Sequence, residues 1–270
     1  MLSRVVTARR ITDRSHPPAE PVGPRSFDYV PARYNRYTDL VGAEVWAWLG
    51  FRLPRPGQTG RALDAGCGTG TYTSLLADRF NEVLAVDLST PMIDHARRHR
   101  PRGNIRYEVR DLRAVTPDTD GWFDAIVCTN TLHHLGDVTS ALWHLRSLVR
   151  PGGTVLLADT VDEQGTPSRP WLRRQAWRQF ASGLRHGRSP REAVELLRLS
   201  LDRDWLDHQT TERLLPPADS HQVVRSVFPG ADLATYGRIH ALSWFCATIP
   251  NDPWPHRMSG AGGGPLGAHR

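Results

Sequence analysis

A glycine-rich turn constrains what this chain can fold into more than any other stretch of the sequence. The residues from Arg61 to Thr71 read RALDAGCGTGT, in which Gly66, Gly68 and Gly70 alternate after a short apolar run and an acid. Glycines at such a turn allow left-handed backbone dihedrals and let a ligand approach the main chain closely. The stretch therefore predicts a strand, a tight turn and the start of a helix, as in nucleotide-binding α/β folds.

The spacing of these glycines indicates which ligand the turn suits. A dinucleotide fingerprint of the form G-x-G-x-x-G would need its third glycine where the chain has Thr71. The phrase LDAGCGTG instead resembles the first motif of class I S-adenosylmethionine-dependent methyltransferases. The resemblance implies a Rossmann-like α/β fold, with a seven-stranded sheet whose seventh strand is antiparallel and a helical cap inserted after the fifth strand. It also implies S-adenosylmethionine as the cofactor, bound near Asp64, Gly66, Cys67 and Gly68.

An acid follows the next apolar run. The run 83–86 is typical of a buried parallel strand, and it ends in Asp87, about 20 residues after the first glycine of the turn. A carboxylate there accepts hydrogen bonds from both hydroxyls of a ribose, which suits S-adenosylmethionine and NAD equally. Asp87 therefore predicts adenosine recognition without choosing between the two cofactors. The resemblance adds Leu88 and Met92, which follow closely, to the cofactor site.

Two later strand ends extend the resemblance. The alternating stretch 105–109 predicts a third strand before Asp111 and Leu112, which the resemblance assigns to the adenine ring. The fourth strand, 123–128, leads into TNTLHHL, which resembles the family's small-molecule enzymes, and Asn130 is expected beside the amino-acid part of the cofactor. Enzymes that methylate exocyclic amines of bases carry Asn/Asp-Pro-Pro-aromatic at this place, so the sequence disfavours a nucleic-acid base as the acceptor.

The candidate catalytic residues are His134 and His133. An imidazole titrates near neutral pH and can accept a proton from an acceptor group. The resemblance implies that the loop after the fourth strand, which carries both histidines, faces the methyl group. A structural role, in which one histidine supports the lid over the cofactor, is the alternative.

Aromatic residues predict where the acceptor binds. The segment 26–50 resembles the leading segment that folds over the cofactor in many relatives, and helices within 162–215 would roof the acceptor pocket. Tyr29, Tyr34 and Tyr37 in the first segment are lid candidates, with Tyr34 expected at the cofactor and Tyr29 at the acceptor, unless they only pack the helix onto the sheet. In the second segment Trp171, Trp177 and Trp205 would form an aromatic enclosure for a flat or greasy acceptor, unless they only pack the helices together.

The charge of the chain raises the question of a nucleic-acid partner. The net charge is +6, the sequence pI is about 9.8, and all 34 basic residues are arginine. The absence of lysine indicates a coding bias, typical of a bacterium with GC-rich DNA, rather than a phosphate-binding surface. The arginine clusters within 97–113 and 169–188 are interpreted as solvated faces with salt-bridge partners, so no nucleic-acid partner is predicted.

Neither the cysteines nor the histidines predict a metal site. Cys67, Cys128 and Cys246 are far apart in apolar or glycine-rich contexts, which predicts reduced, buried thiols rather than a disulfide or a zinc site. His95 and His99 have the i,i+4 spacing of a metal-binding pair. Neighbouring arginines would repel a cation, however, and no third ligand is spaced nearby.

The chain is expected to form one α/β domain over residues 26–249, with the cap at about 162–215. Helices are expected at 138–149, 190–199 and 221–228, and further strands at 154–159, 231–236 and 239–249. The Pro- and Arg-rich residues 1–25 and the Pro- and Gly-rich residues 250–270 are expected to be disordered. With no apolar run near the 20 or so residues that span a bilayer, and no signal core, a cytoplasmic monomer or homodimer without a membrane partner is predicted.

The resemblance implies transfer of a methyl group from S-adenosylmethionine to a small-molecule acceptor, with secondary-metabolite biosynthesis as the expected setting. One alternative is a protein that keeps the fold and the cofactor but catalyses a reaction such as a cyclisation, or serves as a binding module. Another is a nicotinamide-dependent oxidoreductase, which Thr71 and the later motifs disfavour.

Overall fold

The computed structural model describes residues 31–55, 57, 60–163 and 165–247. Tyr29 and the two terminal segments that are predicted to be disordered lie outside these ranges. Within the described part of the chain, no helix combines the length and the apolar character that a bilayer-spanning segment requires.

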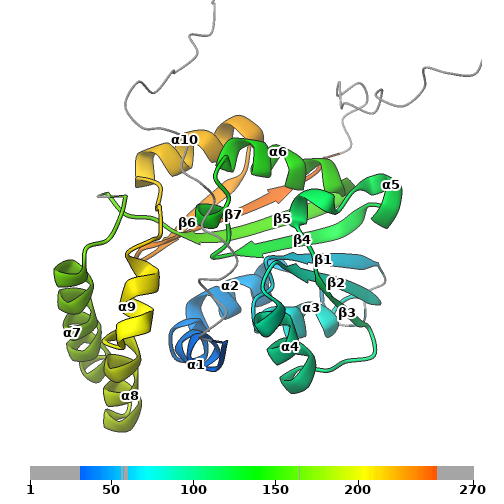
Figure 1. The fold of residues 1–270 in the computed structure, drawn as a ribbon. Helices are drawn as coiled ribbons and strands as arrows, with labels where there is room; N and C mark the ends of the chain where they lie inside the picture. Colours follow the sequence, from blue (N-terminus) through cyan, green and yellow to red (C-terminus); the bar gives the residue numbers. More distant parts are fainter. Residues whose placement is uncertain (1–30, 56, 58–59, 164, 248–270) are drawn as a thin grey trace, which may run out of the picture.

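Seven strands form a single sheet. They are β1 Arg61–Ala65, β2 Glu82–Asp87, β3 Ile105–Val109, β4 Phe123–Thr129, β5 Val149–Thr160, β6 Asp232–Tyr236 and β7 Ile239–Phe245. Their order across the sheet is β3-β2-β1-β4-β5-β7-β6 (Figure 1). Only β7 is antiparallel to its neighbours, β5 and β6, and the other neighbours pair in parallel. This topology confirms the fold class predicted from the sequence.

Helices cover both faces of the sheet and add a separate group beside it. The helices are α1 Pro31–Val41, α2 Ala43–Arg52, α3 Thr73–Ala77, α4 Thr90–His99, α5 Pro117–Asp120, α6 Val138–Leu148, α7 Arg169–Arg185, α8 Pro190–Ser200, α9 Arg203–Gln209 and α10 Pro217–Val227, with short 3-10 turns η2 Leu112–Ala114 and η3 Leu132–His134. One buried cluster joins α6 and α10 to the sheet, and another joins α2 and α3 to the opposite face. α7, α8 and α9 stand apart, next to α1 (Figure 1). Three salt bridges link α1 to this group: Arg36–Glu195, Arg33–Asp202 and Arg33–Asp204.

Three element boundaries differ from the sequence-based expectation. β5 begins at Val149, five residues before the expected start, because the backbone of this segment already pairs with the residue after β7: the N–H of Gly152 donates to the carbonyl of Cys246, and the N–H of Cys246 donates to the carbonyl of Gly153. α10 begins at Pro217 rather than at position 221, since a proline fits the first turn of a helix. β7 ends at Phe245 rather than at position 249.

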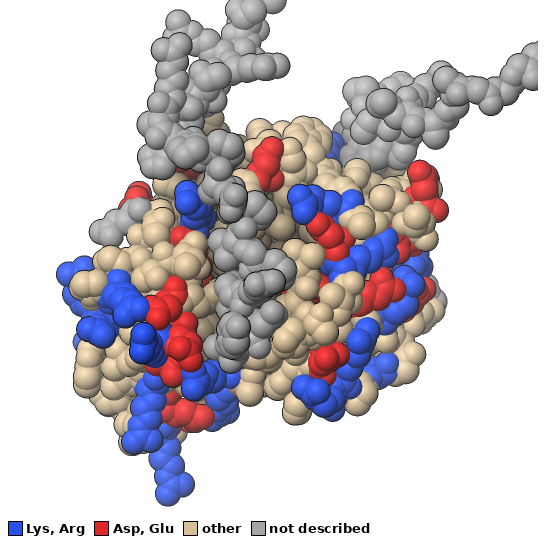
Figure 2. Space-filling model, in the orientation of Figure 1, with Lys and Arg blue, Asp and Glu red and all other residues tan. Residues whose placement is uncertain are grey.

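Acids accompany the arginines of α4, β3 and the following loop. Pairs with N–O distances of 2.5–3.6 Å join Arg97 to Asp94, Arg102 to Asp78, Arg106 to Glu108, Arg110 to Asp120 and Arg113 to Asp111. Figure 2 shows basic and acidic side chains interleaved on the visible face. This arrangement agrees with the interpretation of the cluster as a solvated face with salt-bridge partners.

Candidate active site

The glycine turn connects β1 to α3 and folds back over the end of β2. The N–H groups of Gly66 and Cys67 both donate to the carbonyl of Val86, at 2.9 Å. Gly66 has φ of 76°, and a Cβ added there would lie 2.2 Å from Oγ1 of Thr131. Because L side chains rarely adopt this φ and Thr131 leaves no room, only glycine fits the position.

Asp87 organises the other side of this turn. Its Oδ2 accepts a hydrogen bond from the N–H of Gly68, and its Oδ1 accepts one from the N–H of Ser89, both at 2.9 Å. Burial raises the pKa of Asp87, although these backbone hydrogen bonds act in the opposite direction. The two carboxylate oxygens can together accept hydrogen bonds from a vicinal diol.

A cavity of about 390 Å³, here called the strand-edge pocket, lies at the carboxyl ends of β1, β2 and β4. Asp111 caps η2 at its rim by accepting the N–H of Arg113 at 2.9 Å, and its carboxylate also pairs with the Arg113 side chain, which lowers the pKa of Asp111. The sequence-predicted residues that line the pocket are Tyr34, Gly66, Gly68, Asp87, Leu88, Met92, Asp111, Leu112, Asn130 and His134.

Two residues predicted for the cofactor lie beneath the turn instead of in the pocket lining. Asp64 is 1% exposed and accepts a hydrogen bond of 2.5 Å from Thr73, and burial raises its pKa to about 7. Cys67 packs in a buried cluster with Ile93 and Tyr107. Both side chains therefore support the turn from the core side.

A second cavity of about 730 Å³, here called the cap chamber, lies between α1, α7, α9 and the β6–β7 turn. The ring of Trp205 lies 5.0 Å from that of Tyr37 and 6.1 Å from that of Tyr34. Trp177 is 56% exposed. Cζ of Arg238 lies over the ring of Trp171, 4.4 Å from the centre of that ring. The three-tryptophan enclosure expected from the sequence is thus corrected: of the three, Trp205 alone lines the chamber.

The lining of the cap chamber is also more polar than a greasy acceptor would need. The position of residues around α7 explains why Trp177 does not line the chamber: Gln175 and Gln179 face the chamber, while Trp177 faces solvent. Arg238 lines the chamber as well, and it pairs with Asp162 at 3.2 Å. The chamber therefore suits an acceptor that carries hydrogen-bonding groups.

His134 lines both cavities, so the strand-edge pocket and the cap chamber meet at this side chain. Its ring lies 4.0 Å from that of His133, and both rings project from η3. Asn130, with φ of 48°, makes the turn that leads from β4 into η3. Burial and the nearby rings of His133 and His208 lower the pKa of His134 to about 2, so this imidazole is neutral.

Asp159, at the end of β5, fixes the orientation of His133. One carboxylate oxygen lies 2.5 Å from Nδ1 of His133, and the other accepts its backbone N–H at 3.2 Å. Burial lowers the pKa of His133, but the carboxylates of Asp159 and Glu212 outweigh this effect and raise it overall. Nδ1 therefore carries the proton that Asp159 accepts, and Nε2 points away from Asp159.

Sequence reasoning missed Glu212 and His208, which face the histidine pair across the chamber. Oε1 of Glu212 lies 4.0 Å from Nε2 of His133 and 3.6 Å from Nε2 of His208. Burial raises the pKa of Glu212 to about 7 and lowers that of His208 to about 4. Their i,i+4 spacing is visible in the sequence, but nothing there indicates which side of the cap faces the pair.

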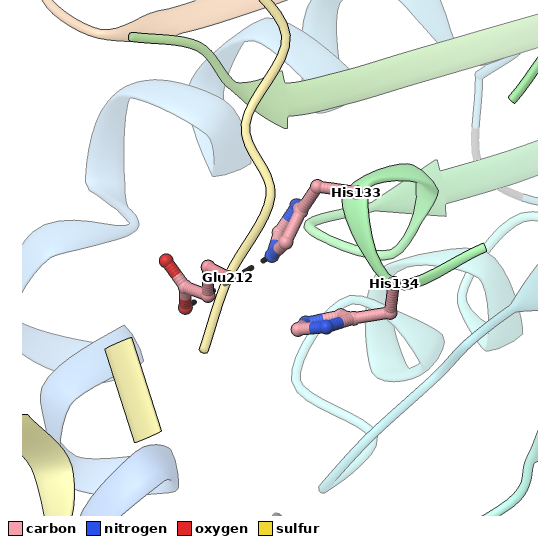
Figure 3. Close-up of side chains that lie close together, drawn as sticks. All are labelled: His133, His134 and Glu212. Carbon is pink, nitrogen blue, oxygen red and sulfur yellow. Dashed lines mark ion pairs between the residues drawn. The ribbon is translucent and has the colours of Figure 1, made fainter. Parts of the chain in front are cut away.

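The histidines considered as a metal pair in the sequence lie elsewhere. The rings of His95 and His99 stack at 4.0 Å, and Nδ1 of His99 lies 2.9 Å from the backbone oxygen of His95. Within the described ranges, the one group of three side chains with donor atoms close enough for a metal ion is His133, His134 and Glu212 (Figure 3). The sequence predicted no metal and did not consider this group.

Comparison with known proteins finds similarity to methyltransferases. A family model described as a methyltransferase domain matches residues 62–153. An uncharacterized methyltransferase of Mycobacterium bovis is 32% identical over 187 residues, which cover 67% of this chain and 85% of the relative. A demethylmenaquinone methyltransferase of Beutenbergia cavernae is 32% identical over 203 residues, or 71% of this chain and 80% of the relative.

Two solved structures share the fold. The DhpI-SAH complex superposes with a TM-score of 0.53 at 22% identity, over 84% of this chain and 98% of that one. An S-adenosylmethionine-dependent methyltransferase from Mesorhizobium loti gives a TM-score of 0.53 at 20% identity, over 76% of this chain and 99% of that one.

Proposed function

This chain belongs to the class I S-adenosylmethionine-dependent methyltransferases, and on that premise we propose that it methylates a small-molecule acceptor bound in the cap chamber. The observation that carries the proposal is the position of His134, which lines both the strand-edge pocket and the cap chamber. A methyl donor in one cavity and an acceptor in the other would meet at this side chain.

The strand-edge pocket fits the cofactor. The carboxylate of Asp87 suits the ribose hydroxyls, and Asp111 with the backbone of Leu112 suits the adenine. Gly66, Gly68 and the backbone at Asn130 remain for the amino-acid part. Asp64 and Cys67 support the turn from below.

When bound, the cofactor supplies a sulfonium methyl carbon, to which an acceptor heteroatom bonds as the carbon–sulfur bond breaks. The protein's part is to align the acceptor and exclude water. We assign removal of the acceptor proton to the His133–His134 pair, because both side chains line the chamber and the imidazole of His134 is neutral. Asp159 holds His133 in one orientation for this role.

The acceptor class follows from the chamber. Tyr37 and Trp205 offer ring faces, while Gln175, Gln179 and Arg238 offer hydrogen-bond donors. We propose a ring-containing metabolite with several polar substituents. Two relatives are named demethylmenaquinone methyltransferase and ubiquinone biosynthesis O-methyltransferase, and these names support a biosynthetic role.

Transfer of a labelled methyl group tests this function. The protein is incubated with methyl-labelled S-adenosylmethionine and a panel of hydroxylated aromatic compounds, and label in the organic extract is counted against a heat-denatured control. The proposal expects label in at least one product together with S-adenosylhomocysteine. Cofactor that binds but is never consumed, across extracts of bacterial metabolites as well as the panel, would favour the non-methylating alternatives.

A further inference from the structure

A buried carboxylate in the cap chamber has no protein partner at hydrogen-bonding distance. Glu212 is 9% exposed, and among the residues that the structure describes no N–H or O–H group donates to its side chain. Its two nearest cationic candidates, His133 and His208, are 4.0 and 3.6 Å away. Buried carboxylates are normally paired, hydrogen-bonded or bound to a metal, so this one calls for a cation.

His133 is held in the orientation of a metal ligand. Its Nδ1 donates to Asp159 at 2.5 Å, which leaves the lone pair of Nε2 directed toward Glu212. A carboxylate behind a histidine fixes the tautomer and the ring orientation in most histidine metal sites. The Asp159–His133 pair has that arrangement, and Asp159 is only 13% exposed at its side chain.

His134 supplies a third donor at the same point. The donor atoms of His133, His134 and Glu212 all lie within 4.8 Å of one another. Figure 3 shows the two rings projecting from η3 toward Glu212, which comes from the segment after α9. Two ligands about 2 Å from a tetrahedral ion are about 3.4 Å apart, so side-chain shifts of roughly 1 Å would close the site.

The local charge also favours a cation. Two carboxylates, Asp159 and Glu212, face imidazoles, while the guanidinium of Arg238 pairs with Asp162 at 3.2 Å. Two imidazoles and one carboxylate form a donor set that suits first-row transition metals, whereas magnesium and calcium prefer oxygen ligands alone.

We propose that His133, His134 and Glu212 bind one divalent first-row transition-metal ion in the cap chamber, beside its junction with the strand-edge pocket. Three protein ligands leave coordination positions open toward the chamber, as in catalytic zinc sites. The role of the ion rests on the proposed function. A hydroxyl oxygen of the acceptor would occupy an open coordination position, and the hydroxyl proton would pass to water because the ion lowers the pKa of that hydroxyl. The ion would then replace the imidazoles of His133 and His134 as the group that activates the acceptor.

Metal binding itself tests the site. The full-length protein is stripped with a chelator, dialysed against zinc, and its bound metal is counted by atomic emission; cobalt binding is followed by visible absorption. We expect one equivalent of zinc, at least tenfold weaker binding in Glu212→Gln and in His134→Asn, and much weaker binding of magnesium. His99→Asn is the matched control, since it removes an exposed histidine outside the group.

Titration with S-adenosylhomocysteine on the same preparations separates the two proposals. Bound S-adenosylhomocysteine without zinc binding would overturn the metal site and leave the proposed function intact. Zinc affinity that is equal in wild type and Glu212→Gln would overturn it as well, as would magnesium binding as tight as that of zinc. Far-UV circular dichroism and thermal melting of each variant show that a loss of zinc is not a loss of fold.

Discussion

The strand-edge pocket and the cap chamber are adjacent, yet they are built in different ways. The pocket is held largely by the backbone: Gly66 and Gly68 donate from their N–H groups to Val86 and Asp87. The chamber is held by side chains from segments far apart in sequence, such as the Asp162–Arg238 pair. The shape of the strand-edge pocket therefore depends on its glycines and on the strand order, whereas the shape of the cap chamber depends on the identity of each side chain.

The largest effect should come from His134, where the cap chamber meets the strand-edge pocket. His134→Ala should lower turnover by about a hundredfold or more, because the acceptor loses a group that activates it. Affinity for S-adenosylhomocysteine should stay within about twofold, since the backbone contacts of the pocket are unchanged. Steady-state kinetics and calorimetry on the same protein measure both quantities. Wild-type turnover in His134→Ala would remove this side chain from the mechanism.

Breaking the turn should affect the pocket and the fold together. In Gly66→Ala the residue would keep a φ of 76° and its Cβ would meet Thr131. The left-handed conformation and the displacement of Thr131 should together lower the free energy of unfolding by about 3 kcal/mol. Urea unfolding measures this change. Gly103→Ala is the control, because its φ is not left-handed and no neighbouring atom lies within 4 Å of an added Cβ.

A smaller effect should appear at acid pH on the adenine side of the pocket. Asp120 pairs with Arg110, which lines the pocket, and this hydrogen-bonded pair lowers the pKa of Asp120 from 3.8 to about 2. A depressed pKa stabilises the fold fully above about pH 4, and the contribution is lost as the pH falls toward 2.

Asp120→Asn measures this contribution. The variant should be less stable than wild type by about 2 kcal/mol at neutral pH, and the gap should close near pH 2. Denaturant unfolding across the pH range gives both values. A gap that stays constant from pH 7 to pH 2 would mean that the ion pair with Arg110 is not its source.

The sequence predicts the pocket better than the chamber for a physical reason. Parallel strands bring their carboxyl ends to one edge of the sheet. Asp87, Asp111 and Asn130 each follow such an end, so the strand order alone places them at the pocket. Asp64 lies outside the pocket lining, because the side chains of a strand alternate between its two faces and that of Asp64 contacts Thr73 in the core. The strand order does not determine on which face of the sheet the Asp64 side chain lies.

The chamber depends on helix phase and on irregular segments. The sequence predicts Trp171 and Trp177 in the lining of the chamber, but Trp177 lies on the side of α7 that faces solvent. Glu212 and Arg238 lie outside helices and strands, so their positions follow from tertiary packing, for which the sequence carries no periodic signal. Tyr29 lies outside the described residues and stays a prediction.

One calorimetric experiment tests most directly the claim that cofactor binding and acceptor activation reside in separate regions. Wild type, Asp87→Ala and Glu212→Gln are each titrated with S-adenosylhomocysteine. We predict that Asp87→Ala binds at least tenfold more weakly, because hydrogen bonds to a charged group contribute about 1.5–3 kcal/mol, and that Glu212→Gln binds like wild type. Equal weakening in both variants, or no weakening in Asp87→Ala, would contradict the division into a cofactor pocket and an acceptor chamber.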